Sequence, residues 1–348
     1  MQRIKLIVVI LTVMGITACT TGTPPIAVES VAPPATVEST IVPVVSPTPV
    51  ELIKVRLPVG YIPNVQFAPL YVGIEKGFYR EKGLDVTIDY SMENDNAVLL
   101  ATGDLQFAIL SGEQVLLGRA QGLPLVYTMA WYQQYPVGIA AKTSAGINSV
   151  ADLKGKKIGL PGLYGASYIG AMALLYSGGL TEKDVTLDSI GFNQVEVLLA
   201  NREDAVVVYV ANEPAQLQRL GENISLLKVA DVLQMVGNGL VTNEKTIKEN
   251  PELVRAMTLA TLDAISYTID HPDEAYEICK GFVPNLTSAD QVVQKQILMN
   301  SIELWKGGRP GFSDLQAWEN MQTTLQKMGL LTSPLDLSTV FTNEFIAQ

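Results

Sequence analysis

The sequence predicts an α/β protein of two lobes, each with a mixed, mostly parallel sheet, a ligand cleft between the lobes and a helical C-terminal tail. Three observations support this prediction. About 295 residues follow residue 53, enough for one large or two medium domains. Short apolar strands alternate with helical segments up to residue 220, without hairpin turns between them. From Pro251 onward the pattern is almost entirely helical.

The first 18 residues are typical of a lipoprotein signal peptide. Arg3 and Lys5 precede an apolar run over 6–18, which is too short for a comfortable membrane-spanning helix. The run ends in the sequence ITAC over 16–19, which matches the bacterial lipobox. We therefore expect lipidation of Cys19 and a location on the extracytoplasmic face of the cell membrane. An ordinary signal peptide with an incidental cysteine is the alternative.

Residues 19–52 are expected to carry the lipid anchor and then act as a spacer. Seven prolines fall between Thr20 and Leu52, among Thr, Ser, Val and Ala. Proline removes backbone donors and favours extended chain, so this stretch cannot build a core. As a coil it would reach roughly 30 Å, and fully extended about 100 Å. A proline-rich partner-binding motif is the alternative.

Lobe 1 is expected to comprise residues 53–140 together with 238–348. Apolar or alternating segments predict strands, and periodic segments that stop at glycines such as Gly77 predict helices. The predicted strands are 55–59, 84–90, 105–110, 123–130 and 137–142, and the predicted helices are 68–76, 95–102 and 112–121. The run 253–269 predicts a long helix in the tail.

Lobe 2 is expected over residues 141–237, inserted into lobe 1. Ser149 can cap a short helix, and the glycine pair 178–179 ends a longer one. The predicted strands are 157–160, 185–190 and 205–210, and the predicted helices are 166–176, 194–201 and 213–220.

Composition excludes several functions. The net charge of −11 becomes −13 without Arg3 and Lys5, and no basic cluster is present, so nucleic acid is not an expected partner. His271 is the only histidine and Cys279 the only cysteine besides Cys19, so a His/Cys zinc site is excluded and no cofactor or metal is expected. His271 is predicted to lie in a surface turn, and no Gly-x-Ser-x-Gly elbow accompanies it, so we expect no enzyme.

The glycine-rich segment 159–166, GLPGLYGA, joins a predicted strand to a predicted helix. Backbone N–H groups at such a helix start point at whatever occupies the cleft. The segment lacks the Lys-Ser/Thr of a P-loop and the spacing of a dinucleotide fingerprint, so it favours a ligand-facing helix start over nucleotide binding. A mere tight turn is the alternative.

Three segments resemble one family of binding proteins. Residues 73–86 read GIEKGFYREKGLDV, residues 103–108 read GDLQFA, and residues 152–159 read DLKGKKIG. Together they are similar to the NMT-type periplasmic-binding family, which includes receptors for thiamine-pyrimidine precursors, sulfonates and riboflavin. The resemblance covers about residues 54–284.

The resemblance implies a type II periplasmic-binding fold that closes on its ligand by hinge motion and delivers it to an ABC-type membrane permease. The same family contains a thiamine-pyrimidine synthase with a cysteine cluster and a catalytic histidine. This chain has neither feature. The resemblance therefore favours a receptor, which we expect to be a monomer.

Candidate ligand-binding residues follow the predicted strands. Ligands of open α/β sheets bind beyond the carboxyl ends of strands, and aromatic residues, only 7% of the chain, are concentrated in these segments. The candidates are Tyr61, Asn64, Phe67, Ser111, Glu113, Trp131, Tyr132, Tyr135, Tyr164, Ser167, Tyr168, Phe192, Asn193, Asn212 and Glu213.

These side chains favour a neutral heteroaromatic ligand. Aromatic faces stack on planar rings, and Asn212 and Glu213 suit ring N–H, amine or hydroxyl donors. No Arg or Lys falls in these segments, so a sulfonate, nitrate or phosphate would lack a charged partner. We expect riboflavin, because the aromatic set is large for one pyrimidine and the chain is similar to riboflavin receptors with a long spacer. An aminopyrimidine thiamine precursor and an aliphatic sulfonate are alternatives. A signalling lipoprotein without a transport role is the alternative of another class.

Overall fold

The structure is a computed structural model that describes residues 51–346. The predicted signal peptide, Cys19 and the spacer up to residue 50 lie outside the described residues. Within residues 51–346, no helix is both long enough and apolar enough to cross a membrane.

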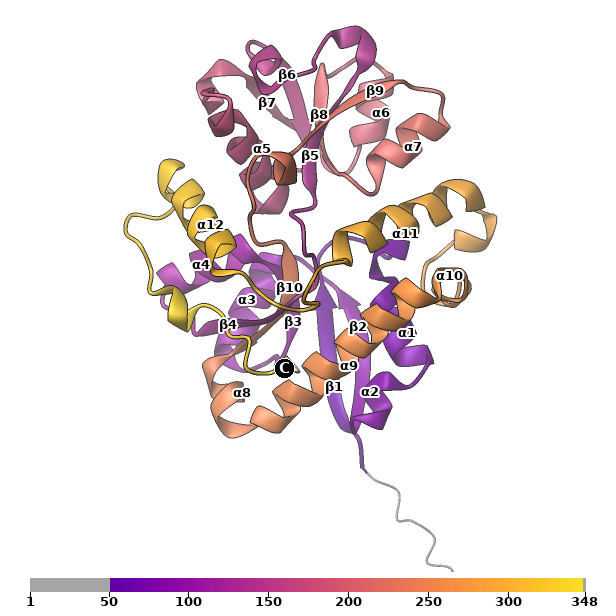
Figure 1. The fold of residues 1–348 in the computed structure, drawn as a ribbon, viewed down its shortest axis with the longest axis vertical. Helices are drawn as coiled ribbons and strands as arrows, with labels where there is room; N and C mark the ends of the chain where they lie inside the picture. The colour runs from indigo at the N-terminus through magenta and orange to yellow at the C-terminus, as the bar shows by residue number, and fades with distance from the viewer. Residues whose placement is uncertain (1–50, 347–348) are drawn as a thin grey trace, which may run out of the picture. The chain divides into compact units, whose positions relative to one another are not determined.

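The strands of the described residues form two five-stranded sheets (Figure 1). The first sheet contains β1 (Ile53–Val59), β2 (Leu84–Tyr90), β3 (Ala108–Ser111), β4 (Leu125–Ala130) and β10 (Asn238–Asn243), in the order β2-β1-β3-β10-β4. The second contains β5 (Val137–Lys142), β6 (Lys157–Leu160), β7 (Thr186–Ser189), β8 (Ala205–Tyr209) and β9 (Ile224–Lys228), in the order β7-β6-β8-β5-β9. We call these sheets and their helices lobe 1 and lobe 2.

Helices cover both sheets. In lobe 1 they are α1 (Ala68–Glu75), α2 (Phe78–Glu81), α3 (Glu93–Thr102), α4 (Gly112–Ala120), α8 (Glu244–Glu249), α9 (Pro251–Asp270), α10 (Pro272–Cys279), α11 (Gln291–Trp305) and α12 (Leu315–Lys327). In lobe 2 they are α5 (Gly165–Ser177), α6 (Gln194–Leu199) and α7 (Glu213–Arg219). The α/β class and the helical C-terminal region are thus confirmed.

Both sheets are mixed, but parallel pairs are not the majority that the sequence predicts. In lobe 1, β1 pairs in parallel with β2 and β3, whereas β10 is antiparallel to β3 and β4. In lobe 2, β6 pairs in parallel with β7 and β8, whereas β5 is antiparallel to β8 and β9. The chain enters lobe 2 through β5 and returns to lobe 1 through β10. These two strands run antiparallel to their neighbours, which is why parallel pairs are not the majority.

The chain crosses between the lobes twice. It leaves the first sheet after Ala130 and enters the second at Val137, and it returns between Lys228 and Asn238. The boundary expected after residue 140 falls inside β5, while the return expected at 238 coincides with the start of β10. Both crossings are short, so the two lobes lie close together.

Apolar side chains explain this arrangement. In lobe 1, Leu57 of β1, Leu70 of α1 and Met257 of α9 belong to one buried cluster. A second cluster joins Val207 of lobe 2 to Trp318 of α12. Burial of each such side chain contributes about 1.5–3 kcal/mol, so the core stabilises the lobes and also the connection between them.

Candidate functional site

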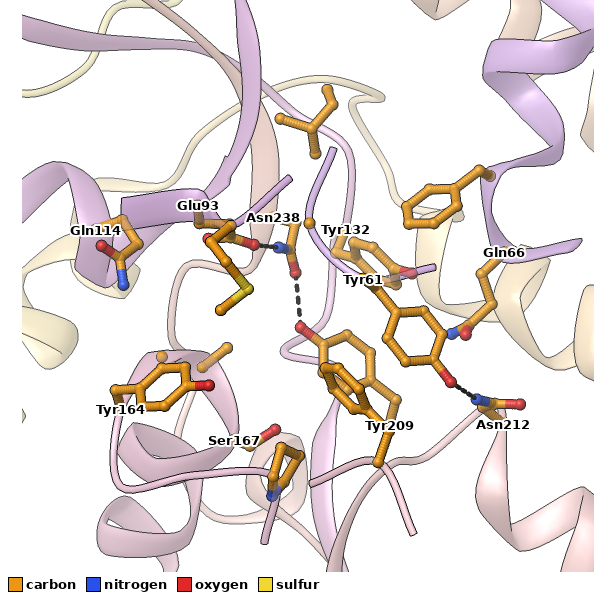
Figure 2. A pocket seen from close by; sticks show the side chains of 18 of the residues that line it. Tyr61, Gln66, Glu93, Gln114, Tyr132, Tyr164, Ser167, Tyr209, Asn212 and Asn238 are labelled. Atoms are coloured by element: carbon orange, nitrogen blue, oxygen red, sulfur yellow. Dashed lines mark hydrogen bonds between the residues drawn. The ribbon is translucent and has the colours of Figure 1, made fainter. Parts of the chain in front are cut away.

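A pocket lies where loops and helix starts of the two lobes face each other (Figure 2). Six of the predicted ligand-binding residues contribute aromatic side chains to its wall: Tyr61, Phe67, Trp131, Tyr132, Tyr164 and Phe192. Three more contribute polar side chains: Ser167, Asn212 and Glu213. Residues chosen because they follow predicted strands, where ligands of open α/β sheets bind, thus lie together around one pocket.

The aromatic residues come from both lobes and from the first crossing. Tyr61 and Phe67 follow β1, Trp131 and Tyr132 follow β4, and Tyr164 and Phe192 belong to lobe 2. Phe67 and Trp131 lie with ring centroids 6.1 Å apart and tilted by 59°. Tyr164 and Phe192 are each 52% exposed, so apolar rings remain open to a ligand at this wall.

Six predicted residues do not line the pocket. Asn64 turns back on its own backbone, where its side chain accepts from the N–H of Gln66 and caps a short helical turn. Asn193 likewise donates to the carbonyl of Ile190. Short polar side chains favour such local bonds, which accounts for the position of these two residues outside the pocket lining; their contact with a ligand stays a prediction.

The other four point elsewhere for reasons of packing. Tyr135 is buried and donates to the carbonyl of Ala166, and Tyr168 bonds to Glu182 at an outer corner of lobe 2. Ser111 and Glu113 are buried behind the pocket wall, where they bond to each other. The first residues of a helix do not all face the cleft, because successive side chains point 100° apart.

Several lining residues are absent from the prediction. Met92, Glu93 and Asn94 follow β2, and the rule applied to other strands would have found them. Gln114 lies one residue beyond the predicted Glu113. Asn238 begins β10, which the sequence pattern does not predict, so no signal pointed to it.

The start of α5 faces the pocket, as expected for the glycine-rich segment. Pro161, Gly165 and Ala166 line the pocket together with Ser167. Gly165 has a φ of 69°, a left-handed conformation that glycine adopts without strain. The turn lets the backbone at the helix start approach a ligand closely.

One row of hydrogen bonds crosses the pocket from lobe to lobe. The amide nitrogen of Asn238 donates to Oε1 of Glu93 at 3.0 Å, and the hydroxyl of Tyr209 donates to Oδ1 of Asn238 at 3.2 Å (Figure 2). Glu93 and Asn238 belong to lobe 1 and Tyr209 to lobe 2. These two hydrogen bonds fix the orientation of all three side chains without a lysine or arginine among the described pocket residues.

Two carboxyl groups and no lysine or arginine line the pocket in the described part of the chain. Burial raises the pKa of Glu213 to about 7, although hydrogen bonds from its own backbone, from the Tyr209 backbone and from Asn212 act in the opposite direction. Burial also raises the pKa of Tyr61 to about 12, so this phenol stays protonated at neutral pH. The pocket can therefore donate and accept hydrogen bonds, but it offers an anion no cationic side chain.

His271 and Cys279 take no part in this site. His271 lies between α9 and α10, where its ring packs on Tyr267 at 4.3 Å between centroids. Cys279 is buried, and burial raises the pKa of its thiol to about 12. An unreactive thiol is the consequence.

Comparisons with known proteins agree with this geometry. The profile of the family described as NMT1/THI5 like matches residues 64–275. The riboflavin-binding protein RibY of Chloroflexus aurantiacus is 38% identical, over 97% of this chain and 96% of that protein. The formylaminopyrimidine-binding protein of Halalkalibacterium halodurans is 28% identical, over 84% of this chain and 90% of that protein.

More distant matches include an enzyme and a solved binding protein. The 4-amino-5-hydroxymethyl-2-methylpyrimidine phosphate synthase of Legionella pneumophila is 23% identical, over 84% of this chain and 92% of the enzyme. The alkanesulfonate-binding protein SsuA of Xanthomonas axonopodis pv. citri, solved with MOPS, has a TM-score of 0.65 at 15% identity, over 84% of this chain and 99% of that chain. This likeness shows the fold alone, and it confirms the predicted periplasmic-binding fold.

Proposed function

The chain belongs to the NMT1/THI5-like family, and from this premise we propose that it is the solute-binding protein of an ABC importer whose ligand is riboflavin. A receptor of this kind needs a cleft between two lobes that can close on a solute. The pocket between the two sheets, built from both lobes and the first crossing, meets that need.

The observation that carries the choice of ligand is the aromatic wall without a cation. Six aromatic residues line the pocket. Tyr61, Phe67, Tyr164 and Phe192 present ring surface to it, whereas Trp131 and Tyr132 line it from buried positions. A fused heteroaromatic ring stacks on such surfaces at about 0.5–1.5 kcal/mol per ring pair beyond burial. The polar side chains beside them, such as Asn238 and Gln114, suit the hydroxyl and carbonyl groups of riboflavin. The relative named as riboflavin-binding supports the same choice.

A sulfonate or another anion fits this pocket less well. Glu93 and Glu213 line it, and no lysine or arginine of the described residues does. An anion enclosed there would be desolvated without a charged partner, which is costly. A formylated aminopyrimidine carries no charge of that kind, and the matching relative named for it makes it the second candidate.

The receptor is also favoured over a synthase. The family's synthases use a cysteine cluster and a catalytic histidine, whereas the single histidine here, His271, lies outside the pocket and Cys279 is buried elsewhere in lobe 1. A signalling lipoprotein with an empty cleft would retain no ligand. A ligand that stays bound through purification, seen by native mass spectrometry, would contradict that alternative.

The partners follow from the same proposal. The delivery step requires an ABC-type permease in the membrane, and lipidation of Cys19 would hold the receptor near it. An anchored receptor gains effective concentration at the permease, and the proline-rich spacer supplies reach.

Titration of the purified protein with riboflavin tests the proposal. Stacking in the pocket should quench flavin fluorescence at micromolar or lower concentration. Tyr164→Ala, which removes a half-exposed ring of the pocket wall, should weaken this binding. Leu220→Ala, which removes an exposed apolar side chain outside the pocket, should not. No quenching, with thermal stabilisation by formylaminopyrimidine instead, would transfer the proposal to that ligand. No response to either compound would overturn it.

A further inference from the structure

Two carboxyl groups, one in the pocket wall and one buried behind it, contact the same hydroxyl group. The Ser111 hydroxyl oxygen lies 2.6 Å from Oε2 of Glu93 and 2.5 Å from Oε1 of Glu113. A hydroxyl group has a single hydrogen to donate, so it can donate to only one of these oxygens. The second short contact is a hydrogen bond only if that carboxyl group carries a proton. One proton on the pair of carboxyl groups accounts for both contacts.

The surroundings place this proton on Glu113. Glu93 already accepts from the Ser111 N–H at 2.8 Å and from Asn238 at 3.0 Å, as an ionised carboxylate does. Glu113 is 0% exposed, and its Oε2 has no hydrogen-bond partner within residues 51–346. A buried charge with one oxygen unpaired is costly. Glu113 thus donates to Ser111, and Ser111 donates to Glu93.

The pKa directions agree with this arrangement. Burial, and next the nearby charge of Glu93, raises the pKa of Glu113 to about 8. Burial also raises the pKa of Glu93, while the bonds from Ser111 and Asn238 oppose that rise. At neutral pH Glu113 is therefore the carboxyl group that keeps its proton.

Glu93 retains one acceptor position. A carboxylate offers about four lone-pair sites. Two bonds from Ser111 reach Oε2, and one bond from Asn238 reaches Oε1. Within the described residues Oε1 thus keeps a free lone pair, and Glu93 lines the pocket.

We propose that Glu93 anchors the ligand in lobe 1 by accepting a hydrogen bond from its N–H or O–H group. Glu113 is then a positioning residue: it donates its own proton to the Ser111 oxygen, so that the Ser111 hydroxyl donates to Glu93, which stays ionised. This inference rests on the proposed function, and it specifies which ligand group Glu93 recognises. The ligand must present a hydrogen-bond donor here, as the ring N–H or a side-chain hydroxyl of riboflavin does.

Other titratable groups face the pair from neighbouring elements. They are Tyr127 of β4, Tyr135 of the first crossing, Tyr209 of β8 and, further along the pocket, Glu213 of α7. Burial raises the pKa of each of these tyrosines further above its usual value, so they stay neutral. The pKa of Glu213 is raised to about 7, so its titration overlaps that of the pair, and the test removes it by mutation.

Affinity should therefore depend on pH in two limbs. Burial raises the pKa of Glu93, and below that pKa the anchor is a neutral carboxyl group, which accepts hydrogen bonds more weakly than a carboxylate, so affinity falls. Above about pH 8 Glu113 loses its proton, and closing the dry pocket over two neighbouring charges becomes unfavourable, so affinity falls again. In each limb the affinity should fall by at most about tenfold per pH unit, because one proton is involved. A plateau between the limbs is the expected profile.

Riboflavin titrations from about pH 5 to about pH 9 test this profile in the Glu213→Gln background, with Glu93→Gln, Glu113→Gln and Glu75→Gln added separately. Glu93→Gln should weaken binding about tenfold or more at the plateau. Glu113→Gln, which copies the protonated acid, should lose the alkaline limb and keep the acid limb. Glu75→Gln removes an exposed carboxylate on α1 and should change neither limb. Unchanged affinity in Glu93→Gln, or an alkaline limb that survives Glu113→Gln, would overturn the inference.

A measurement without ligand separates this inference from the proposed function. Infrared spectra of the Glu213→Gln protein at neutral pH should show a protonated carboxyl band that disappears when Glu113→Gln is added and persists when Glu93→Gln is added. Failure of riboflavin and formylaminopyrimidine to bind would end the proposed function and the anchor together. The infrared band would still decide where the proton resides, and its absence would refute that placement.

Discussion

Tyr61 and Phe192 meet edge to face across the pocket, with ring centroids 4.9 Å apart and planes at 80°. Tyr61 follows β1 of lobe 1, and Phe192 follows β7 of lobe 2, so this contact joins the lobes. The Tyr61 hydroxyl also accepts from the amide of Asn212 at 3.5 Å (Figure 2). Tyr61 has a φ of 81°, which a non-glycine residue rarely adopts. This conformation aims its ring at the opposite lobe.

Removing either ring should weaken ligand binding. Tyr61→Ala and Phe192→Ala are each expected to reduce riboflavin affinity about tenfold, because each removes stacking surface and the contact that links the lobes. In a double-mutant cycle the coupling energy should be about 0.5–1.5 kcal/mol. Leu220→Ala, at an exposed position outside the pocket, provides the control. Strictly additive losses would show that the two rings do not act together.

Sequence patterns predict most of the fold because they report local periodicity. Strands 84–90 and 137–142 match β2 and β5 residue for residue, and the long helix near 253–269 is α9. β9 and β10 escape prediction. β10 begins with Asn238 and Gly239, a pair that usually signals a turn. Its place between β3 and β4 depends on pairing with distant strands, which local patterns do not report.

The sequence predicts those residues of the candidate site that follow a predicted strand, but not which of them face the pocket. Tyr61 and Phe192 come directly after strands and reach the pocket, whereas Tyr135 follows β4 at a similar distance and is buried under α5. The strand-end rule reaches Glu93, which follows β2, but its hydrogen-bond partners Ser111 and Asn238 are far away in the sequence, so the pattern does not reveal its role. Which face of a loop or helix meets the cleft is decided by tertiary packing.

Stability should decrease as the pH rises through neutrality. The pKa of Glu213 is raised from 4.5 to about 7 in the folded chain, so the folded state binds this proton more tightly than the unfolded state. The resulting stabilisation is complete below about pH 4.5 and is lost as the pH rises through about 7. Glu113 contributes in the same direction. Glu213→Gln should therefore raise the unfolding free energy above pH 8 by about 2 kcal/mol.

Thermal unfolding at several pH values measures this effect. The difference between wild type and Glu213→Gln should shrink as the pH is lowered toward 5, because the wild-type carboxyl group then carries its proton. Glu75→Gln, which neutralises an exposed carboxylate, controls for net charge. A constant difference at all pH values would contradict the assignment to Glu213.

Gly239 of β10 should tolerate no side chain. A Cβ at this position would overlap the ring of Tyr127 and the carbonyl oxygen of Met129, both on the neighbouring strand β4. The Tyr127 ring is buried, and its hydroxyl donates to the carbonyl of Gly237, so it cannot easily give way. Gly239→Ala should cost about 3 kcal/mol of stability, measured by denaturant unfolding. Gly308→Ala should be neutral, because among residues 51–346 no heavy atom lies within 4 Å of the added Cβ. Equal stability of the two variants would contradict the packing argument.

Replacing Cys19 should separate the proposed tether from the binding site. The sequence ITAC over 16–19 predicts lipidation, and the pocket residues all lie in the described part of the chain beyond residue 50. Cys19→Ser should therefore leave riboflavin affinity unchanged, shift the protein out of the membrane fraction and reduce riboflavin uptake by cells, because the receptor loses its effective concentration at the permease. Cys279→Ala, which changes the buried thiol and keeps Cys19, should stay in the membrane fraction. If Cys19→Ser also remained there, lipidation at this residue would be refuted. If Cys19→Ser lost affinity for riboflavin, the N-terminal tether and the ligand-binding part of the chain would not be independent.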